Sequence, residues 1–570
     1  MNFIGVDVGT GSARAVVVDN KGEILGSGGC EITTWNESTD FYEQSSENIW
    51  HACCKAVKQA LEVAKVKPDT IKGIGFDATC SLVVLDAEGN PISVTTETPE
   101  DDDRNIILWM DHRAKEQAQR ITDTKSEVLK FLGGTMSLEM EIPKILWLKE
   151  NKPTQFKKMF FYDLPDFLTL KATGSTSRST CSLVCKWTYI PPEIADETHC
   201  TKHGWDDKLF DAVGLTDLKM DNYARIGGVP GTNGCVLTAG EKVGDLSEEA
   251  AKQLGLIPGI AVGSAVIDAY AGWVGTVGAP FSTQQDDTIV NTKIEEAPKR
   301  LALICGTSSC HLVTSPSAIF VPGVWGPYYS ACLPSMWVAE GGQSATGKLI
   351  DWVIDNHVAS SEAYQEAKSQ SMDIYQYLNH RLDQIKVKRG APNLTSLTQH
   401  FHMIADFHGN RSPLADSSLR GMIVGLDLDY LEIDSLALQY YVTMEAIAYN
   451  TRQIIEALNQ SGHEVDTLFM SGGLCKNPIF VQLHADITGF PVVLPKYIHS
   501  AVVLGAAILG ATAYGSGYDS LWDAMTNMNK ADKVIHPTQD ENMLSIHQRK
   551  YEVMKLMQQH QKEYQKIMNA

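Results

Sequence analysis

The chain has 570 residues, more than one hydrophobic core usually organises, so two domains are expected. Its formal net charge of −21 argues against nucleic acid and anionic membranes as partners, because both bind cationic surfaces. The sequence has no apolar run long enough to span a bilayer, and a strand begins too early to leave room for a signal peptide. The expected location is therefore cytoplasmic.

The first predicted element is a β-hairpin over residues 5–19, GVDVGTGSARAVVVD. Its tip carries Thr10, Gly11 and Ser12, where backbone N–H groups and hydroxyls can approach an anion such as phosphate. Asp7 precedes the tip, where a carboxylate can hold a phosphate-bound Mg²⁺. An ordinary glycine-rich turn with a surface aspartate is the alternative.

Two further acidic residues follow in the first half. Residues 71–86 predict a strand, a polar turn and a second strand, with Asp77 at the end of the first strand. Asp111 lies just before a predicted helix and is followed by Arg113. It could bind polyol hydroxyls, or it could form a salt bridge at the entrance to the helix.

Two charged residues stand alone in uncharged surroundings. Lys186 interrupts the uncharged run 179–189, which suggests either a lysine at the edge of the fold or a ligand for an oxygen-rich substrate. Asp268 is the only charged residue in the small and apolar stretch 255–278. Burying a lone carboxylate is costly unless it is paired or used, which favours a catalytic base; a helix N-cap is the structural alternative.

A polar linker over 282–299 predicts a boundary between a domain at 1–281 and a domain at 282–570. The second half then repeats the opening plan over 301–315, with Gly306, Thr307 and Ser308 at the tip. Ile304 takes the place of Asp7 in this repeat. Two such hairpins and one metal-ready carboxylate favour a single Mg-nucleotide clamped between two related domains.

Later segments add further candidates. Glu340 precedes two glycines and a predicted helix, and residues 406–416 form a dense polar loop. Gly472 and Gly473 lie at a strand-to-helix turn that can contact a flat ligand such as adenine, and Asn477 begins the next helix. The small-residue helix 501–511 is expected to pack against the same site. The last residues predict a docked terminal helix, with a contact in a homodimer as the alternative.

The order of these features is that of an actin-like (ribonuclease H-like) ATPase fold, an α/β architecture in which two domains close over Mg-ATP. Over nearly its whole length the sequence resembles the FGGY family of carbohydrate kinases, in particular its ribulokinase-like branch. The resemblance rests on these segments: GVDVGTGSARA, ILWMDHRA, CKW, VIDAYAG, ICGTSSCHL, EGGQSATG, FHGNRSP, MSGGLCKNP and VVLGAAILGA.

The resemblance implies an ATP-dependent and Mg²⁺-dependent kinase that phosphorylates the terminal hydroxyl of a ketopentose, D-ribulose first. It implies that Asp268 is the general base, that Asp7 serves the metal, and that Lys186 and Glu340 are sugar ligands. Asp77 and Asp111 are further candidates for the sugar side. The implied nucleotide-binding residues are Thr10, Gly11, Ser12, Gly306, Thr307, Ser308, Gly472, Gly473 and Asn477. Glu141 departs from the family pattern, which expects a small hydroxyl residue or proline three positions before Lys144.

Three other functions stay open. An actin-like chaperone or cytoskeletal ATPase would hydrolyse ATP without a sugar, but no β-rich peptide-binding module follows the second domain. A non-catalytic sugar sensor would keep the fold and lose the chemistry, although both Asp7 and Asp268 are retained. The third differs only in substrate, such as L-ribulose, xylulose, ribitol or glycerol, because pocket shape and not residue type sets stereochemistry.

Overall fold

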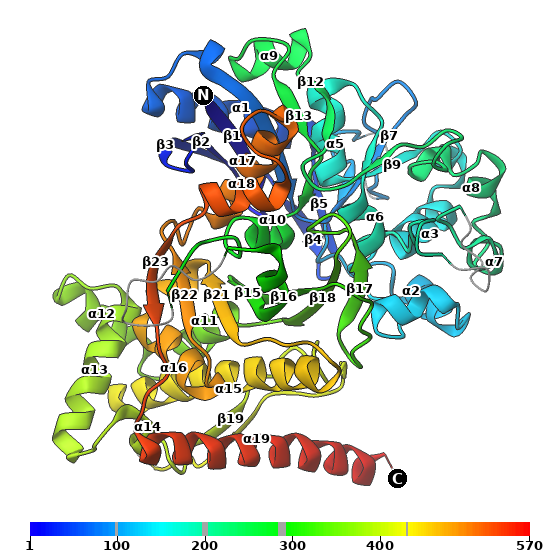
Figure 1. The fold of residues 1–570 in the computed structure, drawn as a ribbon. Helices are drawn as coiled ribbons and strands as arrows, with labels where there is room; N and C mark the ends of the chain where they lie inside the picture. Colours follow the sequence, from blue (N-terminus) through cyan, green and yellow to red (C-terminus); the bar gives the residue numbers. More distant parts are fainter. Residues whose placement is uncertain (97–100, 196–202, 283–291, 429–430, 570) are drawn as a thin grey trace.

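The computed structural model describes residues 1–96, 101–195, 203–282, 292–428 and 431–569. Two large mixed sheets, one from each half of the chain, lie at its centre and are covered by helices (Figure 1). The first sheet has the strand order β12-β13-β6-β1-β2-β3, and β14 also pairs with β6. Its strands are β1 (Asn2–Val8), β2 (Ser12–Asp19), β3 (Ile24–Glu31), β6 (Ile71–Ala78), β12 (Lys242–Asp245), β13 (Ala261–Gly263) and β14 (Val266–Ile267).

The second sheet has the order β17-β18-β16-β15-β21-β22-β23. Its strands are β15 (Arg300–Cys305), β16 (Ser309–Ser315), β17 (Trp325–Tyr329), β18 (Trp337–Gln343), β21 (Thr467–Ser471), β22 (Val492–Pro495) and β23 (Ala531–Ile535). Smaller sheets are formed by β4 (Trp35–Ser38), β5 (Phe41–Gln44), β7 (Leu82–Leu85), β8 (Ile106–Ile107) and β9 (Phe160–Asp163), by β10 (Arg178–Ser179) with β11 (Val236–Leu237), and by β19 (His402–Ile404) with β20 (Met422–Val424).

Helices connect and cover the strands. In the first half they are α1 (Ser46–Ala64), α2 (Lys115–Asp123), α3 (Glu141–Asn151), α4 (Pro153–Phe156), α5 (Leu164–Thr173), α6 (Thr180–Lys186), α7 (Asp207–Ala212), α8 (Thr216–Met220), α9 (Glu248–Leu254) and α10 (Asp268–Val274). In the second half they are α11 (Gly347–Asn356), α12 (Ser360–Ser369), α13 (Ile374–Arg389), α14 (Leu394–Leu397), α15 (Ile433–Gln460), α16 (Pro478–Thr488), α17 (Ala501–Tyr514), α18 (Leu521–Met528) and α19 (Glu541–Met568).

The two large sheets repeat one topology. In the first, β1 is antiparallel to β2 and parallel to β6; in the second, β15 is antiparallel to β16 and parallel to β21. The two predicted hairpins are therefore confirmed. Asp7 pairs with Arg14 across the first hairpin, whereas Ile304 pairs with Cys310 across the second. Half of the linker predicted over 282–299, residues 283–291, lies outside the described residues.

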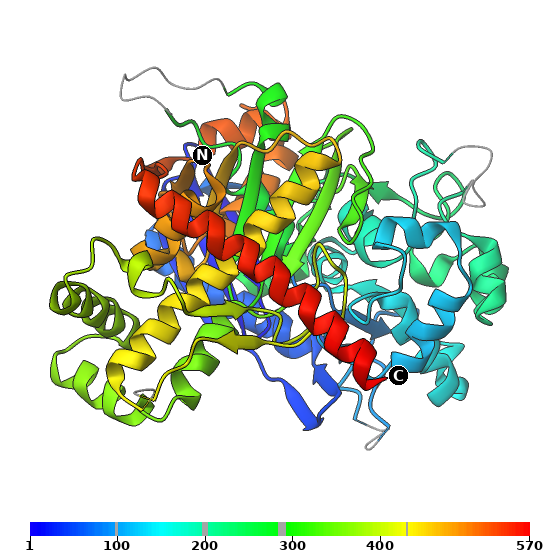
Figure 2. The same ribbon diagram turned by 90° about the horizontal axis from the view of Figure 1, so that it is seen from below.

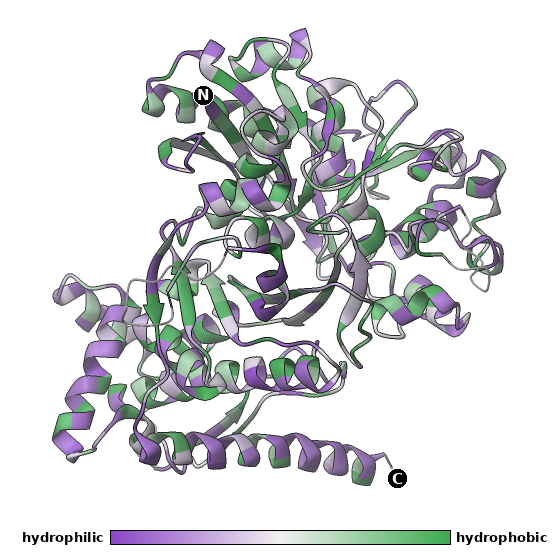
Figure 3. Cartoon of the chain, viewed as in Figure 1, coloured by the Kyte–Doolittle hydropathy of each residue, from purple (hydrophilic) through white to green (hydrophobic). Residues whose placement is uncertain are grey.

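Apolar residues fill the space between the layers. Figure 3 shows that the central strands are largely hydrophobic, whereas α12, α13 and α19 at the periphery present many hydrophilic residues. The β-branched strands β1 and β2 bury Val6, Val8 and Val17 completely. Buried Val and Ile side chains suit the pleated surface of a sheet, and their burial holds the strands that end at the site.

One helix of each half reaches across to the other half. Helix α10 contacts β15 and β16 of the second sheet, and α17 packs on β1, β6 and β13 of the first. The two helices also cross each other, and a Cβ built on Gly505 would lie only 2.0 Å from the carbonyl oxygen of Ala271. The small residues of 501–511 fit the backbone of the first sheet, and contact of this helix with the adenine site stays a prediction.

The terminal helix α19 docks along the second half, against α15 and β19 (Figures 1 and 2). A buried ion pair joins Lys550 to Glu445 of α15, and Gln558 donates a 3.0 Å hydrogen bond to Asp406. These contacts agree with the predicted docked helix and anchor the loop after β19. Among the described residues, none of the helices combines the length and the apolar character that crossing a membrane requires.

Candidate active site

Two carboxylates lie side by side at the ends of adjacent parallel strands. Asp7 of β1 and Asp77 of β6 are register partners, and both side chains are buried. Neither carboxylate oxygen of Asp77 has a hydrogen-bond partner among the described residues. Burial raises the pKa of Asp7, and burial together with the charges of Asp7 and Asp268 raises the pKa of Asp77 well above its ordinary value. The charge of Arg14 offsets the rise at Asp7 only in part, and a buried carboxylate pair of this kind favours a bound cation.

The chemistry of these oxygens suits Mg²⁺, which prefers carboxylates, water and phosphate oxygens. Within the described part of the chain, no group of three or more His, Cys, Asp or Glu side chains is arranged to hold a metal ion. Asp7 and Asp77 therefore offer part of a coordination shell, and water or a phosphate would have to supply the rest. This is the usual situation for Mg²⁺ that arrives with a nucleotide.

Asp268 is the first residue of α10, directly after β14, and β14 pairs with β6 at Asp77. The N-cap position belongs to Ile267, so the alternative role of Asp268 as an N-cap is wrong. Its Oδ1 accepts a 2.7 Å hydrogen bond from the backbone N–H of Ala269. Burial and the neighbouring charge of Asp7 raise the pKa of Asp268 to about 7. A carboxylate of that pKa is suited to accept a proton near neutral pH.

Lys186 and Glu340 come from different halves of the chain and lie close together. Lys186 is buried at the end of α6, so the alternative of a lysine at the edge of the fold is wrong. Its Nζ lies 3.6 Å from Glu139 Oε2 and 4.7 Å from the ring centroid of Trp325. Although burial disfavours its charge, acidic neighbours that include Glu340 and Glu139 raise the pKa of Lys186 well above its ordinary value.

Glu340, in the middle of β18, is held from two sides. The hydroxyl of Tyr270 donates a 2.8 Å hydrogen bond to Oε2, and Arg411 Nη2 lies 2.5 Å from Oε1. Both Lys186 and Glu340 act electrostatically on Asp268, which places these three groups in one region. Tyr270, Trp325, Glu139 and Arg411 were not predicted from the sequence as site residues. Tyr270 lies in the apolar stretch around Asp268 and Arg411 lies in the polar loop 406–416, and both segments had been singled out.

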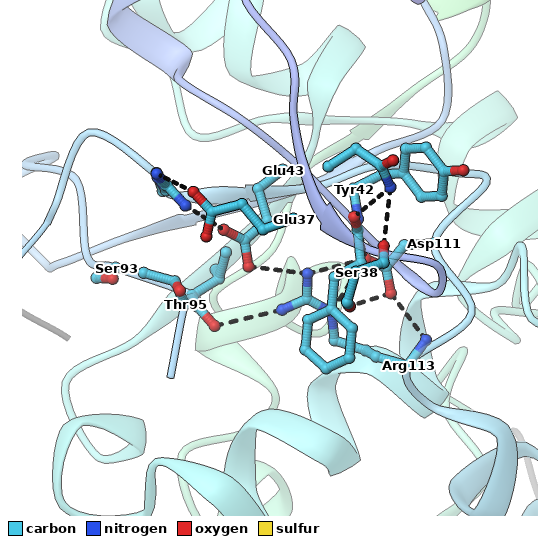
Figure 4. Close-up of polar contacts among 12 residues, drawn as sticks. Glu37, Ser38, Tyr42, Glu43, Ser93, Thr95, Asp111 and Arg113 are labelled. Carbon is cyan, nitrogen blue, oxygen red and sulfur yellow. Dashed lines mark hydrogen bonds and ion pairs between the residues drawn. The ribbon is translucent and has the colours of Figure 1, made fainter. Parts of the chain in front are cut away.

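Asp111 forms an ion pair with Arg113 (Figure 4). Arg113 donates hydrogen bonds to both of its carboxylate oxygens, at 2.8–3.0 Å, and the backbone N–H of Tyr42 donates a further one of 2.7 Å. Arg113 also bonds to Glu43. The structure therefore contains the salt bridge that the sequence left open as the alternative. A sugar contact of Asp111 stays a prediction that would require this pair to open.

The predicted nucleotide-binding residues form two groups. In the first hairpin, Trp109 Nε1 donates a 3.1 Å hydrogen bond to the hydroxyl of Thr10, and the backbone of Gly11 and Ser12 completes the tip. In the second, the backbone N–H of Gly306 donates to the carbonyl of Ser308, and Thr307 accepts from the N–H of Thr346 just before α11. Backbone groups and small side chains thus form both hairpin tips.

The turn after β21 touches the second hairpin. Gly472 has φ +100°, and a Cβ there would lie 2.3 Å from the carbonyl oxygen of Cys305, which explains a glycine at this position. Gly473 has open space around it. Asn477 caps α16 by accepting a 3.1 Å hydrogen bond from the N–H of Ile479, so it begins the helix as predicted. Contact of these residues with adenosine stays a prediction.

The departure at Glu141 is compensated within the fold. Glu141 and Lys144 form an ion pair three residues apart on α3, with an Nζ to Oε2 distance of 3.2 Å and both side chains completely buried. Burial raises the pKa of Glu141 to about 8, against the charge of Lys144. Glu141 therefore acts as the partner of a buried lysine.

Comparisons with known proteins agree with this arrangement. Residues 2–275 match the N-terminal domain of the FGGY family of carbohydrate kinases, and residues 301–514 match its C-terminal domain. The human FGGY carbohydrate kinase domain-containing protein is 48% identical over 570 residues, covering 100% of this chain and 98% of that protein. The D-ribulokinase YDR109C of Saccharomyces cerevisiae is 43% identical over 516 residues, covering 90% of this chain and 72% of that protein.

Solved structures share the fold. A xylulose kinase from Rhodospirillum rubrum has a TM-score of 0.75 at 19% identity, with 99% of both chains covered. A glycerol kinase from Plasmodium falciparum, solved with ADP, has a TM-score of 0.71 at 17% identity, with 98% of both chains covered. These likenesses confirm the expected two-domain actin-like architecture. The chain belongs to the FGGY family of carbohydrate kinases.

Proposed function

We propose that the protein transfers the γ-phosphoryl group of Mg-ATP to the terminal hydroxyl of a ketopentose, converting D-ribulose to D-ribulose 5-phosphate. The observation that carries the proposal is the position of Asp268. It lies beside the Asp7 and Asp77 carboxylates and within electrostatic reach of Lys186 and Glu340. The 43% identity to a protein named D-ribulokinase supports the choice of sugar.

In this mechanism the chain mainly positions the reactants and a proton acceptor, because phosphoryl transfer asks little covalent chemistry of the protein. Asp268 accepts the proton of the terminal hydroxyl, while Lys186 and Glu340 orient the other sugar oxygens. Backbone N–H groups of the two hairpin tips bind the phosphates. Mg²⁺, held by Asp7 and Asp77, would neutralise phosphate charge when bound.

We assign the sugar site and the base to residues 1–281 and most of the nucleotide site to residues 282–570. Glu340 and α17 cross that division, since Glu340 joins the sugar side and α17 packs on the first sheet. Closure of the two halves would exclude water and limit hydrolysis of ATP. A cytoplasmic location and a homodimer stay predictions.

The proposal is tested by ADP release with D-ribulose, L-ribulose, xylulose, ribitol and glycerol as acceptors. We expect D-ribulose to give the highest kcat/KM and its product to be the 5-phosphate. A preference for another acceptor would change the assigned substrate but keep the protein a carbohydrate kinase. ATP consumption at the same rate without any sugar would favour the actin-like ATPase, and the absence of turnover with every acceptor would favour the sugar sensor.

The pH profile gives a second expected result. Since burial raises the pKa of Asp268 to about 7 and a general base acts only when deprotonated, sugar-dependent kcat/KM should fall as the pH decreases through that value. The loss should approach tenfold per pH unit well below the pKa. A coupled assay at constant ionic strength and saturating Mg²⁺ measures the profile. A rate that stays constant down to about pH 5 would contradict an Asp268 base with this pKa.

A further inference from the structure

The loop that carries Arg411 is fixed by its own hydrogen bonds. Asn410 and Asp416 exchange backbone hydrogen bonds, and the Asn410 side chain donates to Asp406 and accepts from the N–H of Leu414. The other oxygen of Asp406 accepts from Gln558 of α19. These hydrogen bonds hold the loop on both sides of Asn410. The backbone of the next residue, Arg411, is therefore fixed in position.

The Arg411 side chain lies against residues assigned to the sugar site. Its Nη2 bonds to Glu340 and lies 4.0 Å from Glu139 Oε2. Its guanidinium carbon is 4.2 Å from the ring centroid of Trp325, the same ring that Lys186 approaches at 4.7 Å. Two cationic side chains thus approach one tryptophan ring, and each of them lies beside a carboxylate. The Arg411 side chain is 11% exposed, so the pair with Glu340 is poorly screened by water.

Gly342 leaves the space that this guanidinium needs. It follows Glu340 by two residues on β18, and a Cβ built on it would lie 2.9 Å from Arg411 Cδ, Nε and Cζ. The tip of a free arginine could move away from such a methyl group. This tip is held by Glu340, however, so a side chain at Gly342 would push it off the carboxylate.

Glu340 keeps hydrogen-bonding capacity after these contacts. A carboxylate offers about four lone-pair sites, and Tyr270 and Arg411 each occupy one. The remaining sites can accept hydrogen bonds from sugar hydroxyls only while the carboxylate keeps its orientation. The binding of a sugar hydroxyl therefore depends on the residues that hold the Glu340 carboxylate in its orientation.

We propose that Arg411 is a positioning residue of the sugar site, which fixes the Glu340 carboxylate for binding sugar hydroxyls, and that Gly342 is required to admit its guanidinium. The inference rests on the proposed function, because it takes Glu340 as a sugar ligand. It adds the polar loop after β19 to the sugar site. A purely structural ion pair would affect stability and both substrates alike, whereas a positioning residue affects the sugar selectively.

The test measures kcat and both KM values for Arg411→Ala, Arg411→Lys, Gly342→Ala and the double variant Arg411→Ala with Gly342→Ala. We expect Arg411→Ala to raise the sugar KM by about 10- to 100-fold and to leave the ATP KM within about twofold. Arg411→Lys should recover part of the loss because it keeps a positive charge. Gly342→Ala alone should raise the sugar KM, yet add less than about twofold to Arg411→Ala, since no guanidinium is left to displace.

Arg420→Ala is the matched control, because Arg420 lies just beyond the same loop and its side chain, among the described residues, bonds to the nearby backbone carbonyls of Ser417 and Leu419. It should match the wild type. An unchanged sugar KM in Arg411→Ala, an equal rise in both KM values, or full additivity of the two substitutions would overturn the inference. If Arg411→Ala does not fold, Arg411→Lys and Gly342→Ala decide the same question. Failure of the wild type to use any sugar would instead count against the proposed function.

Discussion

Asp268→Asn should abolish sugar phosphorylation while leaving ATP binding nearly unchanged. The amide keeps the size of the side chain and can still accept the hydrogen bond from the N–H of Ala269, but it cannot take a proton from the sugar hydroxyl. Loss of a general base typically lowers kcat by about 10² to 10⁴. Steady-state kinetics with the preferred acceptor measure kcat, and titration with a non-hydrolysable ATP analogue measures nucleotide affinity.

Asp245→Asn provides a control for this substitution. Asp245 ends β12 at the edge of the same sheet and forms an ion pair with Lys242 on the surface, so its removal should leave kcat unchanged. Full sugar-dependent activity of Asp268→Asn would remove Asp268 from the mechanism. Equal loss of ATP affinity and of kcat would point to a structural role for the carboxylate.

Local sequence patterns predicted the parts of the site that depend on one or two strands. The tips of both hairpins were recognisable because two apolar strands flank a few small residues within 15 positions, and Asp7 was recognisable because it lies just before the first tip. Asp268 was recognisable because it is the only charge in a small and apolar stretch. The repeated topology of the two sheets confirms that these patterns described the fold correctly.

Residues that meet only through tertiary structure could not be predicted in this way. Arg411 is 71 positions from Glu340, and Lys186 is 139 positions from Trp325, yet these pairs touch. For Asp111 the sequence offered two roles, and only the fold shows the bidentate pair with Arg113. The small residues of 501–511 correctly indicated close packing, but composition alone does not predict which element they pack against.

One of the elements that α17 packs against is α10, the helix that carries the proposed catalytic base. Helix α10 begins with Asp268, and its backbone meets α17 at Gly505, where the two helices cross near the centre of the molecule (Figure 1). The reverse contact is equally close, because a Cβ built on Gly275 would lie 1.8 Å from the carbonyl oxygen of Ala501. We therefore expect the position of the base to depend on two glycines that are not among the residues assigned to either substrate.

Gly505→Ala should accordingly impair both stability and catalysis. Its Cβ would lie 2.0 Å from the carbonyl oxygen of Ala271, and backbone on both sides leaves no flexible group to move aside. Overpacking of this kind typically costs about 1–3 kcal/mol of unfolding free energy. Since Ala271 is three residues after Asp268 on the same helix, we also expect kcat to fall by about tenfold or more through displacement of the base. Denaturant unfolding and steady-state kinetics measure the two effects.

Gly29→Ala is the matched control. Gly29 lies on the exposed side of β3, and the nearest atom to a Cβ there is the carbonyl oxygen of Ala13 at 3.6 Å, an ordinary contact. Its unfolding free energy should stay within about 0.5 kcal/mol of the wild type, with an unchanged kcat. Wild-type stability and turnover in Gly505→Ala would show that α10 and α17 are not in backbone contact. A loss of stability with full kcat would show that the position of Asp268 is independent of the crossing. The contact between α10 and α17 would then contribute to folding alone.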